Sequence, residues 1–161
     1  MKTVKLIKLK ACPEAIEWAS EQKNQKQAWN DCERGDWMLW LLGKLSGKPE
    51  SQKRKKLVLA ACECSRLSLK YIQKDEKRPL IAIETAEKWA KGNATIEEVK
   101  KAATAASAAA TTAASAAAAA YAAYAASYAA AAAASYAAAE KETLKQCAII
   151  VRKHYPNVPK L

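Results

Sequence analysis

The segment that decides the fold is the charge-free stretch 102–139, which reads AATAASAAATTAASAAAAAYAAYAASYAAAAAASYAAA. Of its 38 residues, 27 are Ala and the others are Ser, Thr and Tyr. Alanine has the highest helix propensity of all residues, and the stretch contains no Gly or Pro that would interrupt a helix. The segment therefore predicts α-helix and places the chain in the all-α class.

The length of this helical region indicates that it folds back on itself. One unbroken helix from Thr95 to His154 would be about 90 Å long at about 1.5 Å per residue. A compact domain of this size has a radius of gyration of only about 15 Å. We predict a compact multi-helix bundle in which the region folds into an antiparallel hairpin. The expected break is at Thr111 and Thr112, because β-branched residues form helices less readily than Ala. A projecting rod is the alternative.

The whole chain is predicted to form a single domain. Its parts are a basic lead-in (1–11, a short strand or arm), a Trp-rich helical half (12–93), the Ala/Tyr-rich helices (94–139), and a C-terminal helix and tail (140–161).

Local signals mark where several helices begin. Pro13 suits the first position of a helix. Asp36 can cap the apolar helix that carries residues 37–42. Thr95 with Glu98 three residues later matches a capping box and predicts the start of the long Ala-rich region.

The composition also bounds the compartment. The stretch 102–139 is long enough to span a bilayer, but it lacks the Leu, Ile, Val and Phe that drive insertion. Lysines interrupt the first ten residues every two or three positions, which does not fit a signal peptide. Five Cys, an odd number, do not indicate a disulfide scaffold. We expect a cytoplasmic protein with reduced thiols and no membrane partner.

Residues that commonly carry catalysis are scarce. The single histidine is His154 near the C-terminus, where a cation at a helix end is the commoner role. Cys62 and Cys64 lack the two-residue spacing of a metal knuckle, and no glycine-rich phosphate loop is present. We expect no catalytic residue, no metal, no cofactor and no enzymatic activity.

The charge balance favours an anionic partner. Lys and Arg number 27 against 16 Asp and Glu, a formal charge of +11. Such a charge attracts nucleotides, nucleic acid or acidic proteins, although lysines that only keep an Ala-rich surface soluble are the alternative. Arginine grips phosphate in a bidentate manner, and aromatic rings stack on bases. The predicted ligand-binding residues are Arg34, Trp37, Arg66, Arg78, Tyr121, Tyr124 and Tyr128.

Some of these residues also have a structural interpretation. Arg34 can form an ion pair with Asp31 or Asp36 in the loop that they share. The tyrosines follow one helical stripe, which can pack against the Trp-rich half. The residues predicted to have structural roles are Asp31, Gly35, Asp36, Trp18, Trp40 and Trp89.

Three motifs are similar to those of a known family. They are Cys12-Pro13-Glu14-Ala15, Asp31-Cys32-Glu33-Arg34-Gly35-Asp36-Trp37 and Ile83-Glu84-Thr85-Ala86-Glu87. With the Ala/Tyr-rich region, they resemble, over residues 11–155, small proteins of bacteria and phages named putative immunity proteins. The Arg-Gly-Asp-Trp segment is the most specific part of this resemblance. The resemblance implies a class, the neutralisation of an effector or signal, and no particular mechanism.

Our hypothesis is a non-enzymatic neutralising protein of the immunity or phage counter-defence type. It would bind and sequester an anionic nucleotide-type immune signal or an effector. An immunity protein that binds a protein toxin directly is one alternative. Another is weak, salt-dependent nucleic-acid binding through the basic run 53–56. Assembly through Ala seams is a third, and we expect a homo-oligomer.

Overall fold

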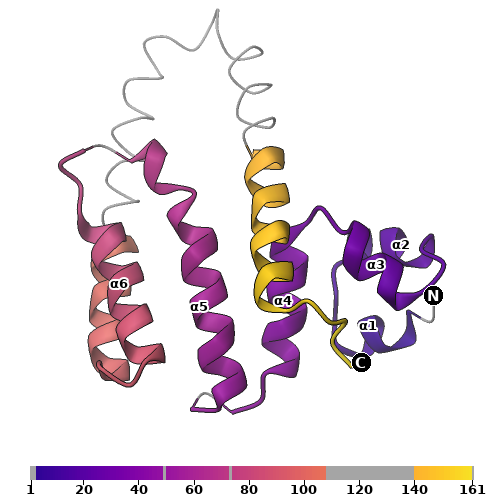
Figure 1. The fold of residues 1–161 in the computed structure, drawn as a ribbon, viewed down its shortest axis with the longest axis horizontal. Coiled ribbons are helices and arrows are strands. Elements are labelled where there is room, and N and C mark those ends of the chain that lie inside the picture. Colours follow the sequence, from indigo (N-terminus) through magenta and orange to yellow (C-terminus); the bar gives the residue numbers. More distant parts are fainter. Residues whose placement is uncertain (1–2, 49, 73, 108–139, 161) are drawn as a thin grey trace, which may run out of the picture. The chain divides into compact units, whose positions relative to one another are not determined.

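The computed structural model describes residues 3–48, 50–72, 74–107 and 140–160. Within these ranges every regular element is a helix and no strand is present (Figure 1), so the predicted all-α class is confirmed. The predicted hairpin and its break at Thr111 and Thr112 fall outside the described residues. The chain divides into two compact units. The first unit is Met1–Ala60 with Leu144–Leu161, and the second is Ala61–Thr143.

The first unit begins with short helices. They are α1 (Val4–Lys8), α2 (Pro13–Ser20), α3 (Gln25–Asp31) and α4 (Gly35–Leu45). The start of α5 (Gln52–Arg66) and most of the described helical residues 140–154, called here the C-terminal helix, complete this unit.

The N-terminal lead-in differs from the prediction. A strand or arm was expected for residues 1–11, but the chain forms helix α1 there. In this helix Leu6 is buried. A half-buried strand requires strict alternation of apolar and polar residues, and the residues around Leu6 do not alternate in this way. The chain leaves α1 through Lys10, which has a left-handed conformation with φ 62°. The Ala11 N–H donates to the Leu6 carbonyl at 3.0 Å, a hydrogen bond typical of a helix C-terminus.

The N-termini of α2, α3 and α4 show which local sequence signals begin these helices. Helix α2 begins at Pro13, as predicted. The Asn24 side chain caps α3 by accepting from the Gln27 N–H at 2.9 Å. Helix α4 begins at Gly35, two residues before the first position that a cap at Asp36 implies, so the prediction that Asp36 caps it is wrong. Asp36 lies in the first turn of α4, where a carboxylate is favoured by the helix dipole.

The core of the first unit lies where α4, the start of α5 and the C-terminal helix meet. Its buried residues include Met38, Leu42, Leu57, Ala60, Ala148 and Val151. Ala60, Ala148 and Val151 have no exposed surface, which shows how closely these elements pack. The C-terminal helix therefore packs into this core through a face that includes Ala148 and Val151.

Arg152 connects the C-terminal helix to α3. Its Nη1 atom donates to the carbonyl oxygens of Trp29 at 3.3 Å and Cys32 at 2.8 Å. These carbonyls lie at the end of α3, where partners within the helix are missing and a cation is favoured. In the reverse direction, Trp29 Nε1 donates to the Tyr155 carbonyl at 3.1 Å.

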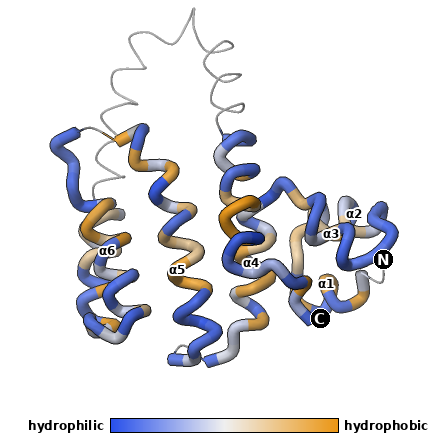
Figure 2. The backbone as a smooth tube through the Cα atoms, viewed as in Figure 1, coloured by the Kyte–Doolittle hydropathy of each residue, from blue (hydrophilic) through white to orange (hydrophobic). Residues whose placement is uncertain are grey.

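Helix α5 changes character along its length. It starts with the hydrophilic run 52–56 and then becomes apolar, as the colours of Figure 2 show. Within the basic run, Arg54 Nη2 donates to the carbonyls of Gly43 at 3.2 Å and Gly47 at 3.3 Å. The one arginine of this run therefore binds the end of α4.

The second unit contains the end of α5, a 3-10 turn (η1, Leu69–Tyr71), α6 (Arg78–Ala90) and the described helical residues 96–107. Cys62 on α5 contacts α6 through its Sγ atom, 3.7 Å from the Ile83 carbonyl. Trp89 is buried on α6.

The predicted capping box is confirmed at the start of the Ala-rich region. The Thr95 N–H donates to Glu98 Oε2 at 2.7 Å, and the Glu98 N–H donates to Thr95 Oγ1 at 3.2 Å. This reciprocal pair satisfies two backbone donors that a helix start leaves without partners.

Candidate functional site

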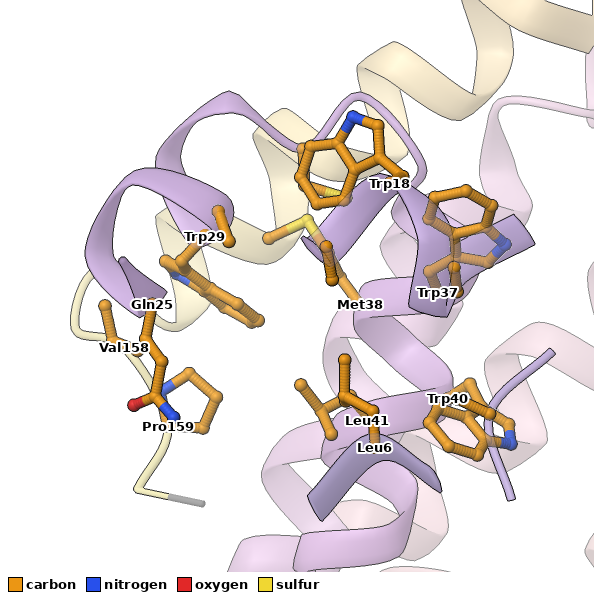
Figure 3. A pocket seen from close by; sticks show the side chains of 15 residues that line it. Leu6, Trp18, Gln25, Trp29, Trp37, Met38, Trp40, Leu41, Val158 and Pro159 are labelled. Atoms are coloured by element: carbon orange, nitrogen blue, oxygen red, sulfur yellow. The ribbon is translucent and has the colours of Figure 1, made fainter. Parts of the chain in front are cut away.

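The described part of the first unit contains an apolar pocket of about 80 Å³, partly open to solvent (Figure 3). Its walls come from α1, α2, α3, α4 and the C-terminal tail. Four tryptophans line it, and the other lining residues include Leu6, Met38, Leu41, Val158 and Pro159. The tryptophans are Trp18, Trp29, Trp37 and Trp40. We call this space the Trp pocket.

Helix periodicity explains why α4 supplies several of these side chains. Trp37, Trp40 and Leu41 stand at positions i, i+3 and i+4, which share one face of a helix. On α2 the same spacing brings Ala15, Trp18 and Ala19 to the pocket, and the two alanines leave the space that the larger side chains surround.

The aromatic side chains are held in defined positions. The ring centroids of Trp18 and Trp37 lie 6.0 Å apart with an interplanar angle of 56°, a tilted arrangement that aromatic pairs favour. Trp29 is buried, and its indole N–H is satisfied by the Tyr155 carbonyl. Figure 3 shows Trp29 beside Val158 and Pro159 of the C-terminal tail. The pocket is therefore preformed.

A cation lies over each of two pocket tryptophans. The Arg34 guanidinium carbon is 4.3 Å from the Trp37 ring centroid, and Lys44 Nζ is 5.6 Å from the Trp40 ring centroid. Both distances are within the range of cation–π attraction, which is worth about 0.5–1 kcal/mol at exposed sites. Positive charge therefore borders the apolar pocket on the α4 side.

Arg34 also forms a bidentate ion pair. Its Nε donates to Asp36 Oδ1 at 2.9 Å and its Nη2 donates to Asp36 Oδ2 at 2.6 Å. Partial burial raises the pKa of Asp36, but the hydrogen bonds and the charge of Arg34 outweigh this effect and place that pKa below its usual range. Of the two partners considered for Arg34, the structure selects Asp36. Asp31 is exposed, and no ion pair of Asp31 is found within the described ranges.

The predicted ligand-binding residues do not gather in one place. Arg34 and Trp37 lie together at the Trp pocket, in the first unit. Arg66 and Arg78 belong to the second unit. Arg66 pairs with Glu87 near the end of α6, whereas Arg78, the first residue of α6, pairs with Glu76. Tyr121, Tyr124 and Tyr128 lie outside the described residues.

The residues predicted as structural have different roles. Trp18 and Trp40 line the Trp pocket, so they also belong to the candidate site. Gly35 packs against the C-terminal helix, close to Cys147 and Ala148.

Several pocket residues were not predicted. Leu6, Trp29, Met38, Val158 and Pro159 come from segments far apart in the chain. The density of Trp in the first 40 residues was a signal for an aromatic cluster, but nothing local places the C-terminal tail beside it.

The described residues contain no group of three or more His, Cys, Asp or Glu side chains suited to holding a metal ion. Among the described helices, no membrane-spanning candidate is found.

These observations define the class: an all-α protein with a preformed, aromatic-walled pocket. A family model described as Imm-5 like putative immunity protein matches residues 47–149, well over half of the chain, and the chain belongs to that family. No curated protein and no solved structure matches it. The Trp pocket is lined entirely by residues outside the matched range, because its walls come from Leu6 to Leu41 and from Val158 and Pro159. The resemblance to immunity proteins is confirmed over residues 47–149, and a general role in immunity follows from the family. The Arg-Gly-Asp-Trp segment lies outside the matched range.

Proposed function

We propose that the chain is a non-enzymatic immunity protein that neutralises an effector protein by binding it directly through the Trp pocket. The observation that supports this proposal is the pocket itself. Its volume of about 80 Å³ is well below the roughly 300–1,000 Å³ of small-molecule sites, and its walls are almost wholly apolar. A pocket of this kind suits one apolar side chain of a protein partner, the anchor that dominates many interfaces.

Sequestration of an anionic nucleotide-type signal is the second candidate function. The formal charge of +11 favours it. It has less support, because Arg34, Arg66 and Arg78 each donate to a carboxylate of their own chain. A nucleotide would have to displace those carboxylates before it received the bidentate contacts that arginine offers to phosphate.

Co-expression tests the proposal. The tagged chain is expressed together with the protein encoded by the gene next to its own, and growth is compared with that of cells expressing the second protein alone. The chain is then purified and examined by native mass spectrometry. We expect the chain to restore growth and to form a stoichiometric complex with the second protein. Restored growth with only a small-molecule mass on the chain would instead favour sequestration of a signal.

Two matched variants connect the result to the pocket. Ala15→Leu places a larger side chain in the pocket, whereas Ala86→Leu makes the same change on α6 in the second unit. The proposal expects complex formation to be lost in the first variant and retained in the second. Loss in both or in neither would contradict a role for the pocket.

A further inference from the structure

We propose that the Trp pocket receives one apolar side chain presented by an acidic segment of the partner protein. This inference rests on the proposed function, and it names the chemistry of the partner. It concerns residues outside the range that the family model matches.

The distribution of charge points to an acidic partner. The first unit contains 17 Lys and Arg against 7 Asp and Glu, a net charge of +10, whereas the second unit contains 10 against 9, a net charge of +1. Nearly all of the formal charge of +11 therefore belongs to the unit that holds the pocket. A concentrated charge of one sign steers partners of the opposite sign and repels those of the same sign.

The charge is also present at the pocket itself. Lys44 lies over Trp40, which lines the pocket, whereas Arg34 over Trp37 is already paired with Asp36. Lys44 is exposed, and no ion pair of Lys44 is recorded in the part of the chain that the structure describes. A carboxylate next to the inserted side chain can therefore reach an ammonium group beside the pocket.

Helix α1, which contributes Leu6 to the pocket wall, also carries exposed apolar residues. Val4 is 58% exposed and Ile7 56%, and both flank Leu6, which lines the pocket on the same helix. Lys5 and Lys8 are interspersed with them. Apolar side chains of this chain surrounded by lysines are complementary to a partner segment in which an apolar side chain has acidic neighbours.

Other occupants fit these observations less well. A second copy of the chain would bring another unit of net charge +10 against this one, which is repulsive. A nucleobase needs hydrogen-bonding partners, but Gln25 is the only amide side chain among the lining residues.

The walls are fixed before a partner arrives. Trp29 holds the C-terminal tail at the Tyr155 carbonyl, and Lys56 Nζ lies 4.8 Å from the Tyr155 ring centroid. The tail segment that follows carries Val158 and Pro159 to the pocket. A preformed pocket lowers the ordering cost of binding, so even a short peptide is a usable probe.

The experiment uses synthetic peptides and the full-length chain labelled with ¹⁵N. The peptides are Glu-Glu-Phe-Glu-Glu, Lys-Lys-Phe-Lys-Lys and Glu-Glu-Ala-Glu-Glu, each with blocked ends. Of the five tryptophan indole N–H groups, four belong to the Trp pocket, and Trp89 in the second unit is an internal control. Titration at low and high salt gives the affinity of each peptide.

We expect the acidic Phe peptide to shift the pocket indole signals and to leave that of Trp89 unchanged. Its affinity should exceed that of each other peptide by about tenfold, and its advantage over the basic peptide should shrink at high salt. Equal affinity of the acidic and basic peptides would overturn the charge part of the proposal. Absence of a pocket shift at millimolar peptide would overturn the whole proposal. Pocket shifts caused by anionic lipid vesicles but not by the acidic Phe peptide would also overturn it, in favour of a membrane surface.

Two variants test the rim charge. Lys44→Glu should weaken binding of the acidic Phe peptide several-fold, whereas Lys74→Glu, an exposed lysine of the second unit, should not. The peptide titration needs no effector, so the two proposals fail separately. If the chain binds the effector but not the peptide, the proposal of an acidic segment with an apolar anchor is wrong. If it binds the peptide but does not protect growth, the proposed immunity function is wrong.

Discussion

Gly35 at the start of α4 packs directly against Cys147 of the C-terminal helix, with no room between them for a side chain. A Cβ atom on Gly35 would lie 2.7 Å from the backbone nitrogen of Ala148, as well as overlapping Cys147. Real Cβ atoms do not approach a backbone nitrogen that closely. The glycine of the Arg-Gly-Asp-Trp segment is therefore required by helix packing.

Substitution of this glycine is predicted to destabilise the protein. Gly35→Ala should lower the free energy of unfolding by about 1–3 kcal/mol, the usual cost of overpacking, as measured by urea denaturation. Gly43→Ala on the same helix is the control, because its Cβ would meet the nearest side-chain atom at 3.9 Å. Helix propensity alone predicts that this control gains about 0.5–1 kcal/mol. Equal effects of the two substitutions would contradict the packing argument.

Arg152 is predicted to be essential for the attachment of the C-terminal helix. Arg152→Met removes the hydrogen bonds to the Trp29 and Cys32 carbonyls but retains much of the side-chain volume. We expect a loss of about 1–3 kcal/mol in the free energy of unfolding, because carbonyls at the end of α3 lose their partner. Arg78→Met is the comparison, since its ion pair with Glu76 is exposed and should contribute little to the free energy of unfolding. A similar loss in both variants would count against a special role of Arg152.

The cysteines are predicted to differ sharply in reactivity. Cys12 is exposed, whereas the other four cysteines are buried. Burial, followed by the nearby negative charge of Glu87, raises the pKa of the Cys62 thiol to about 11. At pH 8 only about one Cys62 in a thousand is then a thiolate, the form that reacts.

A thiol reagent such as dithionitrobenzoate should therefore modify one cysteine rapidly in the native protein and all five in denaturant. Cys12→Ser should abolish the rapid phase. Rapid modification of two or more native cysteines would show that the first or second unit opens more readily than its packing indicates.

The ion pair at the start of α6 is predicted to control the titration of Glu76. Hydrogen bonds from the Arg78 side chain, then from its backbone N–H, lower the pKa of Glu76 to about 2. Because this folded-state pKa lies below the ordinary value of 4.5, the pair favours the folded state above about pH 4.5. That contribution is lost as the pH falls towards 2.

Carboxyl NMR titration measures this effect directly. Arg78→Ala should return the pKa of Glu76 towards its ordinary value, and Arg66→Ala, which removes the pair with Glu87 instead, should not. A Glu76 titration near the ordinary value in the unmodified chain would refute the hydrogen-bonded geometry.

Helix starts were predictable where the signal is local. Pro13 begins α2, and Thr95 with Glu98 forms the expected capping box. In both cases the interacting groups lie within a few residues of each other, so no distant contact is needed. Asp36 shows the limit of this reasoning, because the helix begins at Gly35 and the Asp36 carboxylate, within the first turn, pairs with Arg34.

The candidate site was only partly predictable. Arg34 and Trp37 were both among the predicted ligand-binding residues, and they lie in contact with each other. Arg66 on α5 and Glu87 on α6 are 21 positions apart in the sequence, so helix periodicity cannot reveal that they pair. An arginine predicted to bind a ligand can thus form an ion pair with a carboxylate that is close only in the folded structure.

The sequence by itself determined the helical class, the helix starts at Pro13 and Thr95 and the scarcity of catalytic groups, because these depend on composition and on contacts between near neighbours. Only the tertiary structure decided that Trp29 meets Tyr155 across 126 residues and that Val158 and Pro159 close the Trp pocket. It also decided that Gly35 is a packing contact and not a loop glycine. Such contacts depend on which faces of distant helices pack together, and no local pattern records that choice.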